Sequence, residues 1–126
     1  MTDYPRFRRQ FAEALDRRLY TIEHLDRLVF SGQAQIWFGD EAAIVTEVRA
    51  YPTGALVIHG LVAAAAPDAR PGRAVAEIVD SLIPRAEAWG RSIGCILAII
   101  ESRPGWARAL KPHGYEPHQL AVRKEL

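Results

Sequence analysis

The sequence has little of what disulfide-stabilised, metal-binding, membrane-spanning or nucleic-acid-binding chains need. Among its 126 residues is one cysteine, Cys95, which excludes an internal disulfide and has no partners for a zinc site. The longest apolar run, at 55–66, contains a histidine and is too short to cross a bilayer. Sixteen Lys and Arg against fifteen Asp and Glu give a net charge of +1. No basic block is present, so dedicated nucleic-acid binding is not expected.

The remaining composition is that of one ordinary globular domain over 1–126. Hydrophobic residues make up 49% of the chain and charged residues 25%, enough to build a core. The first residues are charged and lack the apolar stretch of a signal peptide, so we expect a cytoplasmic protein. Cys95 lies within an apolar run and is expected to be a structural thiol.

The N-terminal half changes from helical to strand periodicity. Apolar residues recur at helical spacing over 5–18, and a second amphipathic helix follows Thr21, which is a favourable N-cap. Three apolar segments at 34–38, 42–50 and 55–64 are then separated by tight turns rich in Gly, Asp and Pro. This pattern predicts an antiparallel meander of three strands.

The C-terminal half alternates helices with strands. A Pro- and Gly-containing loop at 66–73 precedes a helical stripe that continues to residue 93, and Pro84 must kink this helix or split it. A buried strand is expected at 95–101, a short helix at 103–111 and a final strand at 119–126. The predicted fold class is therefore α+β, an α/β sandwich of order α-α-β-β-β-α-β-α-β. Its mixed central sheet would carry helices on both faces.

The residues of the second half resemble a known superfamily. The order of elements, with a loop and a long helix after the central strand, is similar to the GNAT-type N-acetyltransferases. The segment 106–126, a short helix leading to a Gly-aromatic pair and a last strand, resembles the closing segment of those enzymes. The stretches 32–48 and 89–110 resemble small GNAT-like proteins of tailed phages, prophages and gene transfer agents.

The resemblance implies where acetyl-coenzyme A would bind. In GNAT enzymes the central strand and the strand after the long helix splay apart, and the pantetheine lies in the opening. Here the strands are 55–64 and 95–101, and the cofactor would run along Ala64 and Ala65 at the end of the first. The resemblance therefore predicts a cleft between these two strands.

The resemblance also places the cofactor's pyrophosphate on the loop 69–74. Gly72 and Ala74 match the family's Gln/Arg-x-x-Gly-x-Gly/Ala motif, whereas Ala69 stands where Gln or Arg belongs. Arg70 and Arg73 would supply positive charge in its place. Consecutive backbone N–H groups at a helix N-terminus favour an anion. An ordinary loop before a helix is the alternative interpretation of the same residues.

The candidate catalytic residues are Glu101, Tyr115 and Glu47. The position of the usual tyrosine acid, four residues before Gly114, is occupied by Leu110, which has no proton to give. Glu101, at the end of the buried strand, could take the ammonium proton, or it could simply cap the next helix. Glu47 could face the acceptor or pair across strands, and Tyr115 could donate a proton or pack in the core.

The sequence thus predicts an acetyl-coenzyme A-dependent N-acetyltransferase of phage or prophage type that acts on an amine, with slow turnover. A catalytically inactive GNAT-like interaction or phage structural protein is the second interpretation, favoured by Ala69 and Leu110. The acceptor amine or protein partner is left open, and a homodimer is compatible with the sequence. A phage-encoded chain would be associated with the virion. No metal is expected.

Overall fold

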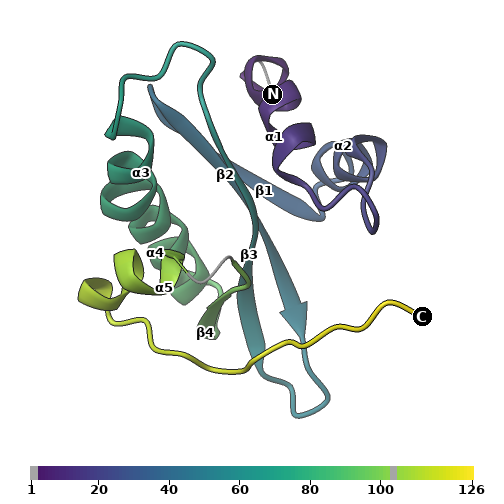
Figure 1. The fold of residues 1–126 in the computed structure, drawn as a ribbon. Coiled ribbons are helices and arrows are strands. Elements are labelled where there is room, and N and C mark those ends of the chain that lie inside the picture. Colours follow the sequence, from purple (N-terminus) through teal and green to yellow (C-terminus); the bar gives the residue numbers. More distant parts are fainter. Residues whose placement is uncertain (1–2, 103–104) are drawn as a thin grey trace.

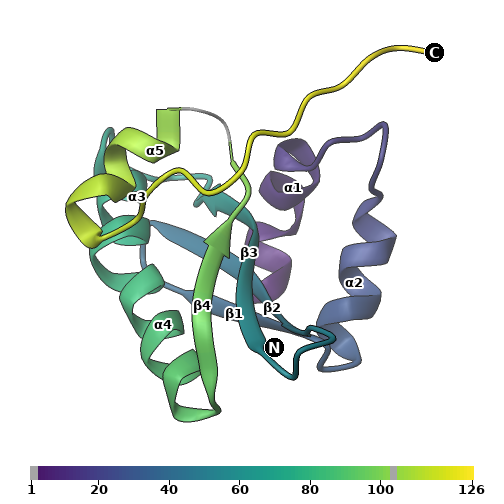
Figure 2. The ribbon, with the colours of Figure 1, turned by 90° about the horizontal axis from the view of Figure 1, so that it is seen from below.

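The computed structural model describes residues 3–102 and 105–126. Its centre is a four-stranded sheet of β1 (Ala34–Phe38), β2 (Ala42–Ala50), β3 (Leu56–Ala65) and β4 (Cys95–Ile100), in that spatial order. The first three strands are antiparallel neighbours, and β4 lies parallel to β3. Helices cover both faces (Figures 1 and 2). The predicted mixed sheet with helices on both faces is confirmed, and the antiparallel meander with it.

Two N-terminal helices cover one face of the sheet. Helix α1 (Tyr4–Ala14) begins with Pro5 in its first turn, where a missing N–H costs nothing, and α2 (Ile22–Phe30) is capped by the Thr21 side chain. The predicted helix over 5–18 is too long. Leu15 already has extended backbone angles, and Asp16 Oδ1 accepts a hydrogen bond from the Arg18 N–H, which stabilises a turn instead.

The opposite face is covered by one long helical run and a short helix. The run consists of α3 (Arg73–Glu77), the π-helical turn η1 (Ile78–Leu82) and α4 (Ile83–Ser92); α5 (Gly105–Leu110) and the 3₁₀ turn η2 (Lys111–His113) follow β4. Pro84 sits in the first turn of α4, directly after the π-helical turn. The helix is therefore irregular, as Pro84 predicts, but it continues through this position without being split.

The sheet separates two hydrophobic clusters. On the α1/α2 face, the largest fully buried side chains are Tyr4, Phe7 and Phe11, which pack over Val45 of β2. On the other face, η1, α4 and α5 bury a second group of side chains against β2 and β3: Ile44, Ile58, Val79, Leu82, Ile83 and Leu110. Both faces of β2 and β3 are thus covered, which explains why 55–64 carries apolar residues on both faces, with His59 as the exception.

The predicted last strand, 119–126, is wrong. Residues from Glu116 to Leu126 are all exposed and belong to no helix or strand. They run as an extended arm from η2 past the sheet and α1 (Figures 1 and 2). The alternating pattern is present, with Leu120 88% and Val122 86% exposed, but no strand in the described part of the chain pairs with it. An alternating sequence indicates that a segment can form a strand. The strand forms only where a neighbouring strand is available to pair with it.

A carboxylate ties α3 to the turn between β1 and β2. Glu77 accepts hydrogen bonds from the backbone N–H groups of Asp40, Glu41 and Ala42, at 3.1, 2.8 and 2.8 Å. Gly39 makes this possible, because a Cβ atom there would lie 2.1 Å from Glu77 Oε1. The contact fixes the start of the long helical run relative to the sheet.

We expect Glu77→Ala to lower the free energy of unfolding by about 2–4 kcal/mol, because three backbone donors lose a charged acceptor. Glu77→Gln keeps one acceptor oxygen and is expected to cost about half as much. Urea denaturation measures both. Glu116→Ala, in the exposed arm, is the control and should change stability by less than about 0.5 kcal/mol. Equal stability of Glu77→Ala and the control would show that the contact does not hold the turn.

Candidate functional site

The site originates in a one-residue irregularity of the sheet. Val45 pairs with Val62 and Thr46 pairs with Gly60, so Leu61 is an extra residue on β3 without a partner on β2. The β3–β4 pairing ends at the next point, where Gly60 pairs with Ile100. A β-bulge bends its strand and increases the local twist. Beyond Gly60, β3 therefore leaves β4, and among the residues that the structure describes its backbone from Leu61 to Ala65 has no pairing partner on that side.

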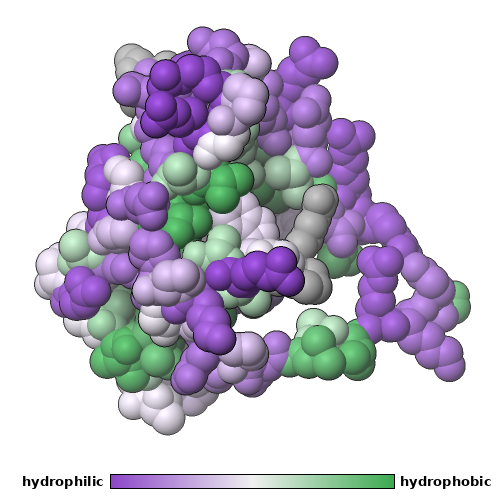
Figure 3. Space-filling model, turned by 60° about the vertical axis from the view of Figure 1, so that its left-hand side comes forward, coloured by the Kyte–Doolittle hydropathy of each residue, from purple (hydrophilic) through white to green (hydrophobic). Residues whose placement is uncertain are grey.

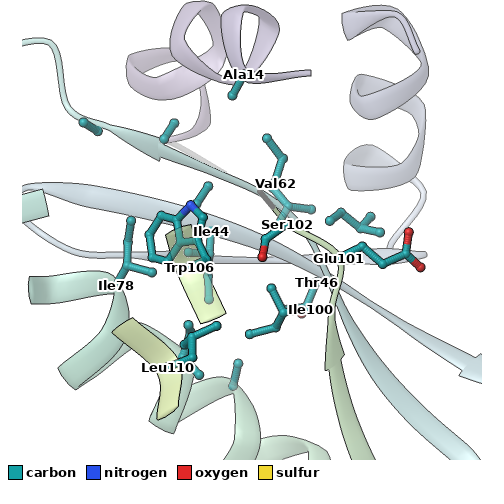
Figure 4. Close-up of a pocket in the computed structure, with 18 of the residues that line it drawn as sticks. Ala14, Ile44, Thr46, Val62, Ile78, Ile100, Glu101, Ser102, Trp106 and Leu110 are labelled. Carbon is teal, nitrogen blue, oxygen red and sulfur yellow. The ribbon is translucent and has the colours of Figure 1, made fainter. Parts of the chain in front are cut away.

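A pocket of about 740 Å³ fills this opening. Its walls are the separated ends of β3 and β4, with α1 on one face of the sheet and η1, α4 and α5 on the other. Figure 4 shows Ile78, Trp106 and Leu110 on the α4/α5 side and Ala14 of α1 on the opposite side. The predicted cleft between 55–64 and 95–101 is thus present. Its volume falls within the range of small-molecule sites.

Glycine is required where the two strands last touch. A Cβ atom on Gly60 would lie 3.3 Å from Ile100 Cγ1, which is tight for a packed core. Gly60 therefore allows β3 and β4 to approach closely immediately before they separate. An isolated glycine in a strand pattern indicates a bulge or a close backbone approach, so this signal was readable in the sequence.

Glu101 lines the pocket at the end of β4. Its side chain is exposed, and in Figure 4 the carboxylate points away from Trp106 and Leu110. Glu101 is also close enough to Arg49 and His59 to affect their pKa values. Of the three candidate catalytic residues, it is the one whose carboxylate stands at the mouth of the opening.

Tyr115 also lines the pocket, but its hydroxyl is engaged. It donates a hydrogen bond of 2.5 Å to Glu87 Oε2 of α4. Burial and the hydrogen bond to Glu87 raise the pKa of Tyr115, so the phenol keeps its proton. Leu110, in the usual acid position, is buried and lines the same pocket.

Glu47 lies outside the pocket lining, in a polar cluster on the α1/α2 face of the sheet. It accepts a hydrogen bond from Arg49 Nε at 2.8 Å, and Arg49 Nη1 lies 3.3 Å from His59 Nδ1. His59 Nε2 lies 2.8 Å from the Tyr51 hydroxyl. Because Arg49 can only donate, His59 Nδ1 is the acceptor and the neutral ring carries its proton on Nε2.

His59 is buried, with 3% of its surface exposed. Burial, and then the positive charge of Arg49, lower the pKa of His59, while Glu101 and Glu47 oppose this shift. The structure therefore holds His59 neutral beside the opening. Nothing in the periodicity of 55–64 distinguishes such a polar cluster from an apolar core.

The expected phosphate loop precedes α3. Gly72 has a φ of +74° and is the N-cap of the helical run that starts at Arg73; no side chain caps this end. A Cβ atom on Gly72 would meet nothing within 4 Å, so the positive φ, and not crowding, is what favours glycine at this position. Ala64 and Ala65 line the nearby end of the pocket, and Ala74 packs on the α4-side cluster.

Arg70 is held by its own chain. Its backbone N–H and its Nε donate to Glu41 at 2.9 and 2.7 Å, and these contacts lower the pKa of Glu41. Arg73 is exposed at the first position of the helix. The two arginines therefore differ: Arg70 fastens the loop to the turn before β2, whereas Arg73 projects near the open helix end.

Several lining residues were not predicted from the sequence. Gln10 and Glu13 of α1, Glu87 of α4 and Trp106 of α5 reach the pocket from elements far apart in the chain. Gln10 Oε1 is a buried acceptor without a hydrogen-bond partner among the described residues. Only the three-dimensional packing brings these side chains together.

The described residues contain no group of three His, Cys, Asp or Glu side chains arranged to hold a metal ion. No helix among them is long and apolar enough to cross a membrane. Cys95 is partly buried at the start of β4, and burial raises the pKa of its thiol, which keeps it protonated.

Solved acetyltransferase structures share this fold. An acetyltransferase from Trypanosoma brucei is 14% identical with a TM-score of 0.71, covering 99% of this chain and 94% of its own. A ribosomal-protein-alanine N-acetyltransferase from Brucella melitensis biovar Abortus 2308 is 11% identical with a TM-score of 0.68 and the same coverage. The aminoglycoside N-acetyltransferase AAC(6')-Iy, solved with CoA, is 16% identical, with a TM-score of 0.62 and coverage of 99% and 89%.

These similarities show the fold of the GNAT acetyltransferases. No protein-family model matches the sequence, and no curated protein matches it. The fold predicted from the order of elements is therefore confirmed by structural comparison. The subfamily of phage type is not tested by it.

We expect the polar cluster to make stability depend on pH. A histidine whose pKa lies below 6.5 in the folded protein binds fewer protons there than in the unfolded chain, so the free energy of unfolding falls as the pH drops below about 6.5. An NMR titration of the His59 ring should give a midpoint below that value. His59→Gln should reduce the slope of stability against pH, whereas His118→Gln, in the exposed arm, should leave it unchanged. A His59 midpoint at or above 6.5 would contradict the assignment.

Proposed function

We propose that this protein binds acetyl-coenzyme A in the opening between β3 and β4 and transfers the acetyl group to an amine. The observation that carries this proposal is the unpaired backbone of β3 beyond Gly60, which forms one wall of a pocket of about 740 Å³. Pantetheine carries amide groups that can pair with such an edge. The GNAT-like fold, shared with a structure solved with CoA, supports the same assignment.

The residues present fit the cofactor at both ends. The pocket lining on the α4/α5 side is largely apolar, which suits a pantetheine chain. At the other end, the helix N-terminus at Gly72, which no side chain caps, offers backbone donors, and the exposed Arg73 adds positive charge. Acetyl-coenzyme A supplies an activated acetyl group as a thioester. Arg70 contributes by fastening the loop through Glu41.

We place the acceptor amine on the α1 side of the opening. Glu101 and Glu13 provide negative charge there, and the unpartnered Gln10 Oε1 can accept a hydrogen bond from an amine. Glu101 is the residue that would take the ammonium proton, directly or through water, because its carboxylate is exposed at the mouth. The apolar walls would exclude water from the thioester.

The proton for the departing thiolate has no dedicated donor among the described lining residues. Leu110 occupies the usual position, and the Tyr115 hydroxyl keeps its proton and donates it in a hydrogen bond to Glu87, with 2.5 Å between the two oxygens. A positioned acid typically contributes about 10²–10⁴-fold, so we expect slow transfer in which solvent protonates the thiolate.

Leu110 and the engaged hydroxyl of Tyr115 also favour a second function. In it, the protein is a GNAT-like module that binds without catalysis and serves as an interaction or phage structural protein. The phage or prophage type rests on the resemblance of 32–48 and 89–110 and is part of this proposal. Measuring thiol release from acetyl-coenzyme A with a panel of polyamines, peptides and aminoglycosides separates the two functions. Binding without release for every amine would favour the non-catalytic module.

We expect Ala63→Phe to weaken coenzyme A binding at least tenfold. Ala63 lies on β3 beyond the bulge and lines the pocket, so a phenyl ring would occupy the space of the ligand. Isothermal titration calorimetry measures the change. Leu19→Phe, at a position 73% exposed outside the pocket, is the matched control and should bind as the natural protein does. Unchanged affinity of Ala63→Phe would place coenzyme A elsewhere.

We expect Glu101→Gln to reduce kcat/KM about 10²–10⁴-fold with any amine that is acetylated, because the proton acceptor is lost. Coenzyme A affinity should stay within about twofold, because the carboxylate points away from Trp106 and Leu110 (Figure 4). Glu47→Gln is the control, since Glu47 lies outside the pocket lining and pairs with Arg49. A larger loss of activity in Glu47→Gln than in Glu101→Gln would reverse the assignment.

A further inference from the structure

A cluster of polar side chains lies on the α1/α2 face of the sheet and takes no part in the transfer steps proposed above. Glu47 of β2 pairs directly with His59 of β3, and Arg49 lies two residues further along β2, so their side chains share one face. Tyr51 follows β2 and its hydroxyl meets the His59 ring. The Arg49 side chain is 41% exposed and Tyr51 is 40% exposed, so the cluster is open to solvent although His59 is buried.

The His59 ring determines which donors of this cluster are already used. Because Nδ1 accepts from Arg49, Nε2 carries the ring proton and donates it to the Tyr51 hydroxyl, 2.8 Å away. The O–H proton of Tyr51 then has no acceptor among the described residues. Arg49 donates from Nε to Glu47 and from Nη1 to His59, and no hydrogen bond joins its Nη2 group to the described part of the chain. Two donors are therefore available beside one buried ring.

The two available donors suit an oxyanion. A guanidinium group binds carboxylates and phosphates through charge-assisted hydrogen bonds, and a phenol adds a neutral donor. Arg49 is already held at Nε and Nη1. The Tyr51 ring stacks on His59, with ring centroids 6.1 Å apart and an interplanar angle of 21°. Both side chains are thus positioned before a ligand binds, which reduces the entropy cost of binding.

Glu101 lies on the same face of the sheet as this cluster. His59 pairs with Ile99 of β4 in parallel register, and side chains alternate, so Glu101 points to the face of His59 two residues further on, about 7 Å along the sheet. The pKa of Arg49 is raised, first by its hydrogen bond to Glu47 and also by the charge of Glu101, so Glu101 and the cluster are within electrostatic range. The partly exposed Ile99 lies between the negative and the positive group.

The other side of the sheet differs in character. Figure 3, in which the α4/α5 side comes forward, shows hydrophobic residues near the middle of that surface. The pocket lining on that side is largely apolar as well, which suits a pantetheine chain better than a charged group. An acceptor with a charged end therefore finds its matching groups on the α1/α2 side.

We propose that the acceptor amine carries an oxyanion, a carboxylate or a phosphate, at its other end, and that Arg49 binds this group with the Tyr51 hydroxyl as a second donor. The inference rests on the proposed acetyl transfer and names the class of its acceptor. The ammonium group lies at Glu101, and the chain that joins the two charges packs on Ile99. A simple amine would leave Arg49 Nη2 unused, and a simple acid would be repelled by Glu101, whereas a zwitterion satisfies both charges.

The first test compares acceptors that differ only in the charge of one end. ε-Aminocaproate and its carboxamide carry the same amine and the same chain, and their acetylation is followed by thiol release from acetyl-coenzyme A. We expect kcat/KM to be at least tenfold higher for the carboxylate, mainly through KM, because the carboxamide loses a charge-assisted hydrogen bond. Aminopentyl phosphate carries the other oxyanion, and a preference for either oxyanion over the carboxamide supports the proposal. Equal values for all three acceptors overturn it.

Variants of the cluster identify the groups that bind the oxyanion. Arg49→Gln should remove the preference for the charged acceptor, and Tyr51→Phe, which keeps the ring on His59, should reduce it about threefold or more. Lys111→Gln and Tyr20→Phe are the matched controls at exposed positions outside the cluster, and both should keep the preference. A full preference in Arg49→Gln contradicts the proposal, and Tyr51→Phe decides by itself if Arg49→Gln does not fold.

Binding is also measured without turnover, on the natural protein with coenzyme A present. Titration with ε-aminocaproate should shift the NMR signal of His59 Cε1–H in a saturable way, because Arg49 and Tyr51 both contact this ring. The carboxamide should shift it far less. A saturable shift without thiol release from any amine would support the oxyanion site and contradict the proposed transfer. Thiol release without a shift by either oxyanion would support the transfer and overturn the oxyanion site.

Discussion

The opening between β3 and β4 depends on one structural feature, the extra residue in β3 opposite the Val45–Thr46 step of β2. Leu61 interrupts the register, and Gly60 marks the last point at which β3 and β4 pair. A sheet without this irregularity would keep both strands hydrogen-bonded to their ends and leave no opening. The pocket, the free backbone of β3 and the position of Glu101 at its mouth all follow from the separation of these strands. Glu77 and Arg70 then fasten the start of the long helical run beside that opening.

The groups around the opening are unevenly suited to acetyl transfer. The proposed binding of acetyl-coenzyme A rests on the apolar walls, the uncapped helix end and the exposed carboxylate of Glu101. The acid is the weak point, because Leu110 has no proton to give and the Tyr115 hydroxyl is engaged as the donor of a hydrogen bond to Glu87. A site with these groups, but with no dedicated proton donor among the described lining residues, suits either a slow enzyme or a binding module. Fold alone does not decide between them.

Local patterns predicted the fold better than the site. Helix and strand periodicity located the meander, the long helical run and β4, and Pro84 predicted its irregularity, which appears as a π-helical turn. The final strand at 119–126 was wrong because pairing depends on a partner that the described chain does not provide. The isolated Gly60 within an apolar strand pattern is a sequence feature that indicates the bulge. The contributions of Gln10, Glu13 and Glu87 were not predictable, since helices distant in sequence bring them to one pocket.

The central claim is that the separated edge of β3 is where coenzyme A binds. Hydrogen exchange of the backbone amides at 61–65, with and without saturating coenzyme A, tests it most directly. Amides that face the opening have no partner on β4, so a bound pantetheine that pairs with them should slow their exchange at least tenfold. Amides of β1, at the far edge of the sheet, should be unaffected. Unchanged exchange at 61–65 while coenzyme A is demonstrably bound would contradict the account.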